Sequence, residues 1–381
     1  MIKKIAADRL KPGMFIHDLD CGWMAHPFLR SRFTLRSEAE IEKITGAGIH
    51  EVYIDTDKGL DAADAPSERE VALSVEREML LASQTGTAAE PSDDPIQAFE
   101  RARRVRTEAY GIIRDVMKSV QSGGEVSIER VEPVVEKVTD AIFRNNGALV
   151  SLCRVKDKDN YTFHHSVSVC ALMVSFGRAL ALDRETVHQV GIGGLLHDLG
   201  KVMVPDGILN KPGRLTDDEW RVMKGHVAEG CRVLGETPGI SDTAAQVAAE
   251  HHERHDGSGY PKGLAGDAIS RVGQMAAICD VYDAITSDRC YHRGLPATDA
   301  LRKVFEWSRF HFSPDMVHAF LRSTGIYPVG SLVMLESGRL AVVVSQGNKN
   351  LLQPTVRVIY HARNQHYLQP ENLDLAKPMG F

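Results

Sequence analysis

The sequence predicts a mainly α-helical fold, in which a helical domain lies between a small N-terminal α/β module and a small C-terminal β appendage. Apolar residues recur at helical spacing over residues 96–324, whereas alternation typical of strands occurs before residue 60 and after Pro328. The connecting residues 61–95 have the Ala, Ser, Thr, Asp, Glu and Pro-rich composition of a linker. The expected parts are a β-rich module at 1–62, a linker at 63–95, a helical domain at 96–325 and a β extension at 326–381.

Both β-containing parts are predicted from short runs bounded by turn residues. The N-terminal module also holds a helix at residues 37–45, and the linker after it holds one amphipathic stretch at residues 71–81. A hairpin turn is expected at residues 336–339. The expected strands are 15–19, 51–55, 332–335, 340–344 and 355–360.

The helical domain is expected to begin with two long amphipathic helices, at residues 96–122 and 128–145. These two helices also offer a surface for a homodimer. A capping box formed by Thr216 and Glu219 predicts the start of the helix that carries His226.

The composition is that of an ordinary globular chain. Over 381 residues the hydrophobic content is 43%, the charged content is 25% and the formal net charge is −6, which argues against DNA as a partner. The six cysteines contain no C-x-x-C pair, which favours a reduced compartment. The longest apolar stretch, residues 167–176, is far shorter than the roughly 20 residues that span a bilayer. We therefore expect a cytoplasmic protein without a membrane segment.

Histidines and aspartates on otherwise apolar helices are the strongest functional signal in the sequence. A buried polar group without a partner is costly, so a shared metal site explains the whole set economically. Any one histidine alone could be a core residue bonded to the backbone, but adjacent His-Asp and His-His pairs on separate helices indicate a joint site. The candidate metal ligands are His165, His197, Asp198, His226, His251, His252 and Asp280.

These ligands divide into two sets that share one carboxylate, Asp198. The first set is His165, His197, Asp198 and Asp280, and the second is Asp198, His226, His251 and His252. Imidazole and carboxylate ligands without thiolate suit Fe or Mn, and also Zn, Co or Ni. Two such ions can hold a bridging hydroxide that attacks phosphorus, so these residues predict a metal-dependent phosphodiesterase.

A longer ordered pattern around the ligands resembles the HD-GYP family of the HD phosphohydrolase superfamily. It reads His197-Asp198-x-Gly200-Lys201, then His226, then His251-His252-Glu253-x-x-Asp256-Gly257-x-Gly259-Tyr260-Pro261, within a match over residues 161–320. The resemblance implies hydrolysis of cyclic di-GMP to pGpG, to GMP, or to both. The N-terminal module resembles an uncharacterised domain that often precedes HD-GYP domains.

The resemblance also implies roles for individual residues. It assigns all the ligand positions above to metal ions, gives Asp198 and Lys201 catalytic roles, and makes Lys201 and Arg289 the phosphate contacts. Tyr161 stands where some members carry a glutamate that holds a third metal, so two metals are expected. The loop residues implicated in substrate contact and in docking GGDEF diguanylate cyclase domains are Gly259, Tyr260 and Pro261.

Several residues keep more than one interpretation. Lys201 could be a solvated cation favoured at a helix C-terminus. Glu253 is expected to support a ligand histidine or to form a surface salt bridge. Tyr260 could stack on a base, face a partner or anchor its loop. His164 is adjacent to His165 and competes with it for the same assignment.

Three other functions compete with cyclic di-GMP hydrolysis. The chain could be a cyclic di-GMP receptor or scaffold that docks a diguanylate cyclase with little turnover. It could hydrolyse another nucleotide, such as cyclic GMP-AMP or guanosine tetraphosphate. A purely structural helical domain would bind no metal.

Overall fold

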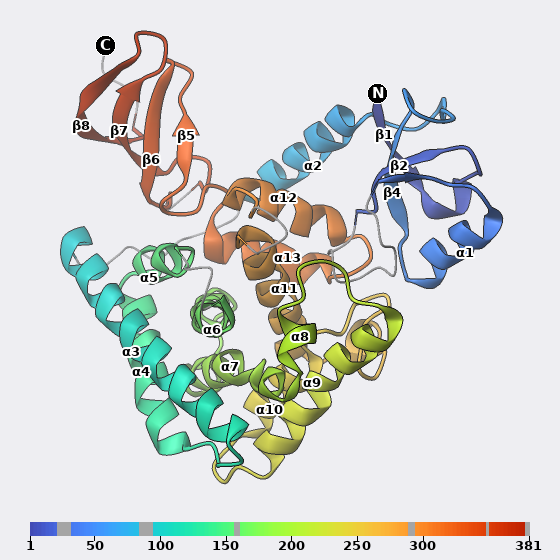
Figure 1. Cartoon of the computed structure of the whole chain (residues 1–381). Helices are drawn as coiled ribbons and strands as arrows, with labels where there is room; N and C mark the ends of the chain where they lie inside the picture. Colours follow the sequence, from blue (N-terminus) through green and yellow to red (C-terminus); the bar gives the residue numbers. More distant parts are fainter. Residues whose placement is uncertain (21–31, 84–93, 156–160, 289–293, 348–349, 378–381) are drawn as a thin grey trace.

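The computed structural model describes residues 1–20, 32–83, 94–155, 161–288, 294–347 and 350–377. A helical body carries a small sheet near each end of the chain (Figure 1). The elements in chain order are β1 (Ile2–Ala6), η1 (Ala7–Arg9), β2 (Phe15–Asp18), β3 (Phe33–Thr34), α1 (Glu38–Gly46), β4 (Glu51–Asp55), α2 (Glu68–Ser83), α3 (Pro95–Gln121), α4 (Ile128–Arg144), α5 (Asn146–Cys153), α6 (Tyr161–Ala179), α7 (Arg184–Leu196), η3 (Leu199–Met203), α8 (Asp206–Leu209), α9 (Asp217–Gly235), α10 (Asp242–Glu250), η4 (Gly266–Ala268), α11 (Arg271–Thr286), α12 (Ala297–Trp307), α13 (Pro314–Thr324), β5 (Leu332–Met334), β6 (Arg339–Ser345), β7 (Thr355–His361) and β8 (His366–Asp374).

The N-terminal module is an antiparallel sheet in the order β1-β4-β2-β3, with α1 beside it. Ile16, Ile44 and Ile54 are fully buried in its core. The strands predicted at 15–19 and 51–55 and the helix predicted at 37–45 are confirmed as β2, β4 and α1. The sequence did not predict β1 or β3.

The amphipathic stretch predicted within the linker is the helix α2, which packs on the helical body. Val75 and Met79 are buried in one apolar cluster with residues of α12 and α13, and α2 lies next to α12 in Figure 1. Hydrophobic burial therefore holds residues 68–83 in place, and they do not form a mobile connector. The division of the chain into four parts stays a prediction.

The helix α6 forms the centre of the helical body. It is apolar on all sides, and every residue from His165 to Gly177 is buried, as expected for a helix surrounded by others. It contacts α3, α4, α5, α7, α11 and α13 (Figure 1). No helix in the described part of the chain is long and apolar enough to cross a membrane.

The amphipathic helices and the capping box predicted for this body are confirmed. α3 and α4 pack against each other and bury apolar faces in the main core. At the start of α9, the Thr216 hydroxyl accepts a hydrogen bond from the Glu219 amide at 3.3 Å. The Glu219 carboxylate in turn accepts one from the Thr216 amide at 2.7 Å.

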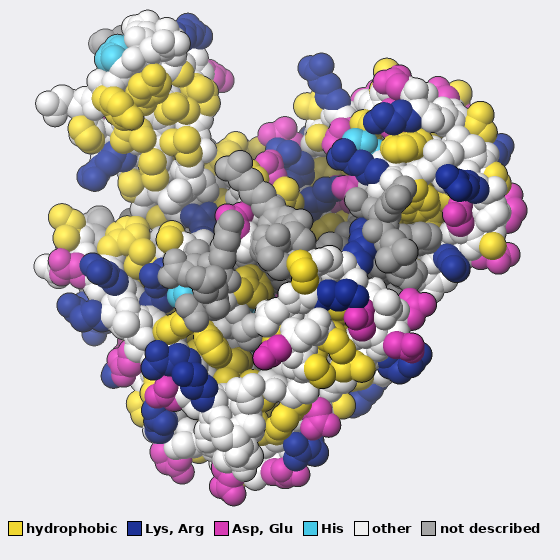
Figure 2. Space-filling view, viewed as in Figure 1, with side chains coloured by type: hydrophobic (Ala, Val, Ile, Leu, Met, Phe, Trp, Pro, Cys, Tyr) yellow, Lys and Arg dark blue, Asp and Glu magenta, His cyan; other side chains and the backbone are white. Residues whose placement is uncertain are grey.

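The C-terminal appendage is an antiparallel meander in the order β5-β6-β7-β8. Ala341, Val343 and Val356 are buried on one face. Leu332 and Met334 are exposed, and Figure 2 shows hydrophobic side chains gathered on the visible face of this sheet. The predicted hairpin and the strand at 355–360 are confirmed, and β8 is an addition to the prediction.

Candidate metal centre

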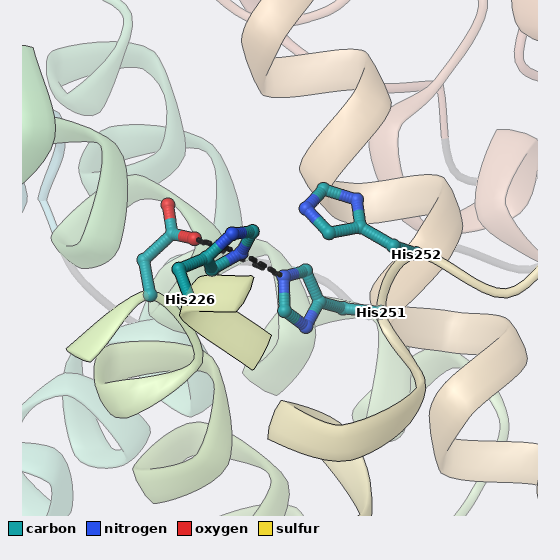
Figure 3. Close-up of side chains that lie close together, drawn as sticks. His226, His251 and His252 are labelled. Carbon is teal, nitrogen blue, oxygen red and sulfur yellow. Dashed lines mark hydrogen bonds and ion pairs between the residues drawn. The ribbon is translucent and has the colours of Figure 1, made fainter. Parts of the chain in front are cut away.

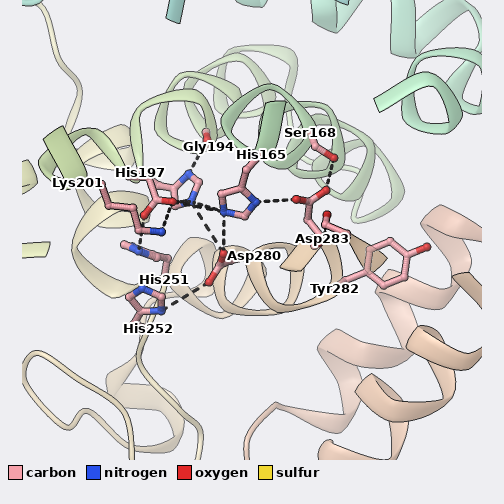
Figure 4. Close-up of polar contacts among 12 residues, drawn as sticks. His165, Ser168, Gly194, His197, Lys201, His251, His252, Asp280, Tyr282 and Asp283 are labelled. Atoms are coloured by element: carbon pink, nitrogen blue, oxygen red, sulfur yellow. Dashed lines mark hydrogen bonds and ion pairs between the residues drawn. The ribbon is translucent and has the colours of Figure 1, made fainter. Parts of the chain in front are cut away.

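The helical body brings all the candidate ligands together. His165 lies in the first turns of α6, His197 and Asp198 directly follow α7, and His226 lies in the middle of α9. His251 and His252 follow α10, and Asp280 lies in α11. The atoms of these residues converge between the helices and form two groups that could hold a metal ion (Figure 4). The groups are Asp198 with His226, His251 and His252, and His165 with His197 and Asp280.

Asp198 lies between these groups and is completely buried. Its Oδ2 is 3.4 Å from Nε2 of His165 and 3.2 Å from Nε2 of His197. Its Oδ1 is 3.4 Å from Nε2 of His226 and 3.8 Å from Nε2 of His251. Each oxygen thus faces a different pair of histidines, the geometry expected of a bridging carboxylate.

The backbone fixes three of the imidazole rings. Nδ1 of His197, His226 and His251 lies 2.7–2.8 Å from the carbonyl oxygen three residues earlier in the chain. Because the carbonyl can only accept, Nδ1 of each ring carries a proton, and in the neutral form of the ring Nε2 presents a lone pair to the centre. Figure 3 shows His226, His251 and His252 turned toward one another.

A carboxylate fixes His165 instead. Nδ1 of His165 is 2.6 Å from Oδ2 of Asp283, whose other oxygen accepts a hydrogen bond from Ser168. Nε2 of His165 is 3.0 Å from Oδ1 of Asp280. Asp283 therefore supports a candidate ligand, and such support raises the basicity of the imidazole. His164 lies outside the centre and stacks on Tyr110.

Some buried acceptor atoms of the centre have no hydrogen-bond donor. This observation tests whether the residues fit metal ions. Oδ1 of Asp198 and Nε2 of His252 are buried with no hydrogen-bond partner. Nε2 of His226 and Nε2 of His251 are 3.4 Å apart although both present lone pairs. Uncompensated buried acceptors are costly, and a cation among them removes the cost. The residues therefore fit divalent metal ions.

The pKa values of His226, His251 and Asp198 are consistent with ligands in their metal-binding states. Burial, with the nearby charge of Lys201, lowers the pKa of His226 to about 4, and burial lowers the pKa of His251 to about 3. Both rings are neutral at pH 7, as a metal ligand must be. Burial alone would raise the pKa of Asp198, but His197 and Lys201 hold it well below 3.8, so the carboxylate is ionised. Burial alone would lower the pKa of His197, but the charges of Asp198 and Asp280 raise it, so without metal this ring tends to be protonated.

Lys201 lies directly beside the shared carboxylate. Its Nζ is 2.6 Å from Oδ2 of Asp198, and its side chain is only 13% exposed, so it is not a solvated surface cation. Gly200 permits this position because a Cβ there would lie 1.9 Å from the carbonyl oxygen of His226. Only glycine lets η3 approach α9 so closely.

Residues 253–266, here called the motif loop, cover one side of the centre. Glu253 is 1% exposed, and its carboxylate accepts hydrogen bonds from the amides of Lys262 at 2.8 Å and Leu264 at 2.9 Å. Both expectations for Glu253 were therefore wrong, since its carboxylate holds the loop and, among the described residues, bonds neither a histidine nor a cation. Gly259 and Pro261 flank Tyr260 in this loop, the former half-buried and the latter exposed.

Tyr260 packs on the candidate ligand His252. Its ring stacks on the imidazole with centroids 4.6 Å apart, and its amide donates to the His252 carbonyl at 3.1 Å. His252 and Asp280, at 6% and 7%, are the most exposed of the candidate ligands. The least buried part of the centre therefore lies beside Tyr260.

Two residues that contact Tyr260 were not predicted from the sequence. Trp220 meets the Tyr260 ring edge-on with centroids 6.0 Å apart, and Nζ of Lys224 lies 5.8 Å from the centre of the same ring. Both lie on α9 shortly before His226. Their nearness to this candidate ligand in the sequence is the signal that could have identified them. Arg289, predicted to contact phosphate, lies outside the described residues.

Two family models match the chain. The HD domain model matches residues 150–316, which include every candidate ligand. The model for a domain of unknown function, DUF3391, matches residues 2–131 and so runs past residue 62, through α2 and α3. Together with the His and Asp centre, these matches define the class: an HD-superfamily phosphohydrolase with an N-terminal DUF3391 domain.

The relatives place the chain more narrowly. It is 39% identical over 381 residues to "Cyclic di-GMP phosphodiesterase PA4108" of Pseudomonas aeruginosa, which covers 99% of this chain and 90% of that protein. The chain belongs to the HD-GYP family.

Two further matches are less extensive. "3'3'-cGAMP-specific phosphodiesterase 2" of Vibrio cholerae is 40% identical over 168 residues, 44% of this chain and 32% of that protein. The solved structure of Bd1817, an HDG"Y"P protein from Bdellovibrio bacteriovorus, has a TM-score of 0.50 at 17% identity. It covers 84% of this chain and 98% of that one, and it supports the fold alone.

Proposed function

We propose that the chain is a metal-dependent phosphodiesterase that hydrolyses cyclic di-GMP to pGpG, to GMP, or to both. The observation that carries this proposal is Asp198, whose two oxygens face two pairs of buried histidines. The relative that matches almost the whole chain is named for the same activity.

Two divalent ions, Fe or Mn in preference to Zn, Co or Ni, would lower the pKa of a bound water and offset charge on the phosphate. Asp198 and Asp280 supply negative charge to hold such ions, and the neutral imidazoles supply lone pairs. Lys201 lies 2.6 Å from Asp198 and is placed to contact a phosphate oxygen, where its charge would stabilise the transition state. The expected ligands, catalytic residues and phosphate contacts, Arg289 included, are part of this proposal.

Tyr260, with Gly259 and Pro261, is expected to contact the substrate at the least buried part of the centre. The stacking of Tyr260 on His252 supports this position, since a substrate bound to the ions would lie next to the same ring. The docking of GGDEF domains, a homodimer through α3 and α4, and a cytoplasmic location stay predictions.

Cyclic GMP-AMP is the second candidate substrate, because a relative named as specific for 3'3'-cGAMP is 40% identical to this chain over 168 residues. We favour cyclic di-GMP because the cGAMP-specific relative aligns with only 44% of this chain, whereas the cyclic di-GMP relative aligns with 99%. A competition assay with both dinucleotides distinguishes the two.

The test is metal analysis and product chromatography on the wild type and on Asp198→Ala. We expect the wild type to hold metal and release pGpG or GMP, and the variant to lose the metal and at least about 1,000-fold in turnover. Asp218→Ala is the control, because this aspartate is exposed on α9 and pairs only with Arg221 among the described residues. Unchanged hydrolysis by Asp198→Ala would contradict the proposal, and binding without product would identify a receptor.

A further inference from the structure

The N-terminal module contacts the motif loop at Asp256. His50, just before β4, places Nε2 2.7 Å from Oδ2 of Asp256, and its ring stacks on Phe310 with centroids 4.4 Å apart. On the other side, Nδ1 of His311 lies 3.3 Å from the same oxygen. Asp256 is therefore held between the module and the residues that follow α12.

A second contact brings the module's backbone against the same loop. Gly48 has a φ of +72°, and a Cβ added there would lie 2.5 Å from Cβ of Ser258. Ser258 is bound to Asp256, whose Oδ1 accepts from its amide at 2.9 Å and from its hydroxyl at 2.6 Å. The space between the module and the loop is therefore too small for one methyl group.

The contacted residues are close to the metal centre along the chain. Ser258 is two residues before Tyr260, and Tyr260 stacks on His252 at 4.6 Å and bonds its carbonyl at 3.1 Å. Movement of Asp256 would therefore be passed through its hydrogen bonds to Ser258, and from there through two peptide units to the ring that stacks on a candidate ligand.

The module is anchored for this contact by a separate buried charge network. Nζ of Lys4 in β1 is 2.7 Å from Oδ2 of Asp20 and also bonds Glu306 of α12. Nζ of Lys303 is 2.7 Å from the other oxygen of Asp20. Lys4, Asp20 and Glu306 have side chains no more than 5% exposed, which distinguishes this interface from an incidental surface contact.

We propose that the N-terminal module holds the motif loop in its working position, and that His50 is a positioning residue that acts on Tyr260 and His252 through Asp256. A signal that shifts the module would then reach the metal centre without a ligand at the centre itself. The measurement of hydrolysis depends on the proposed function, whereas the measurement of hydrogen exchange at the contact does not.

The first test introduces a methyl group into the interface with Gly48→Ala in the full chain. Two matched variants separate the causes. Gly123→Ala has the same kind of backbone strain, at φ +81°, with nothing within 4 Å, and Gly46→Ala lies in the same turn with open space around it. We expect faster hydrogen–deuterium exchange in residues 253–266 for Gly48→Ala alone, with metal content unchanged.

The second test uses His50, which is 40% exposed, so its replacement leaves the core intact. We expect His50→Ala to speed exchange in the motif loop and to lower kcat/KM for cyclic di-GMP about tenfold. His50→Gln, whose amide can still donate to Asp256, should recover most of that loss. Wild-type exchange and wild-type kcat/KM in both Gly48→Ala and His50→Ala would overturn the proposal. A wild type without hydrolysis would defeat the proposed function only, because the exchange result still tests the contact.

Discussion

Two buried charge clusters among the described residues differ in how their polar atoms are paired. In the interface cluster, the carboxylates of Asp20 and Glu306 meet the ammonium groups of Lys4 and Lys303. In the metal centre, Oδ1 of Asp198 and other acceptors have no donor among the described residues. The carboxylates of the first cluster are paired with its own lysines. The second cluster has one lysine, Lys201, beside Asp198, and it still contains acceptors that metal ions could compensate.

The pKa shifts support this contrast. Burial alone would lower the pKa of Lys4, yet Asp20 and Glu306 raise it above 10.5, so the cation stays charged in the interface. In the centre, burial lowers the pKa of His226 and His251, so neither can serve as the missing cation near neutral pH. Unpaired acceptors that lie close together, more than buried charges, distinguish the candidate metal centre.

Metal removal should produce the largest difference between the clusters. We expect a chelator to abolish hydrolysis and to remove the stabilisation by bound metal, about 4 kcal/mol at about 1,000 times the dissociation constant. The acceptors of Asp198 and His252 would then face one another uncompensated. Calorimetry with and without chelator measures the change, and Mn or Fe should restore it. A chelated protein with an unchanged unfolding midpoint would contradict this expectation.

Glu306→Ala should break the interface cluster while leaving the centre loaded. It deprives the buried Lys4 of a partner, and breaking a buried pair in this way costs about 3–5 kcal/mol. Chemical denaturation measures the loss, and metal content should not change. Glu229→Ala is the matched control, since its pair with Arg232 is half-exposed and contributes at most about 1 kcal/mol.

Acid should destabilise the metal-free protein through the centre. The folded pKa values of His226 and His251, about 4 and about 3, are below the ordinary value of 6.5. Between pH 6.5 and 4 the unfolded chain therefore binds more protons, and the free energy of unfolding falls as the pH falls. The expected loss is on the order of a few kcal/mol, measurable by denaturation at pH 7 and pH 5. An equal free energy of unfolding at pH 7 and pH 5 would contradict the lowered pKa values of the two histidines.

The smallest effect is expected from Asp283→Asn, which weakens the support of His165 without removing a candidate ligand. Loss of such a carboxylate typically lowers metal affinity about 10–100-fold. Metal titration measures it, and Asp299→Asn, a partly exposed residue paired with Arg302, is the control. An unchanged affinity would show that Asp283 does not orient His165.

Much of the fold was predictable because the relevant signals are local. The capping box of α9, the amphipathic α3 and α4, and the hairpin of β5 and β6 all arise from residues within a few positions of one another. β1 was not predictable in this way, since Lys3 and Lys4 interrupt its apolar residues. Lys4 is buried only because Asp20 and Glu306, distant in the sequence, surround it.

The same distinction applies to the site. The residue types and their helices indicated which side chains converge, and the structure brings them together. The role of Glu253 was mistaken because its partners are backbone amides at residues 262 and 264, which no side-chain pattern reveals. The contact of His50 with Asp256 joins residues 206 positions apart, so the local sequence around each residue could not predict it.

The packing of α2 has a practical consequence for anyone who wishes to cut the protein into parts. A fragment beginning at α3 would lose Val75 and Met79 and so expose the apolar surface of α12 and α13 that they cover. It would also remove Lys4, the ion-pair partner of Glu306. Such a fragment should aggregate or misreport the activity of the intact chain, so biochemical work on the helical part is best done with the first 83 residues attached.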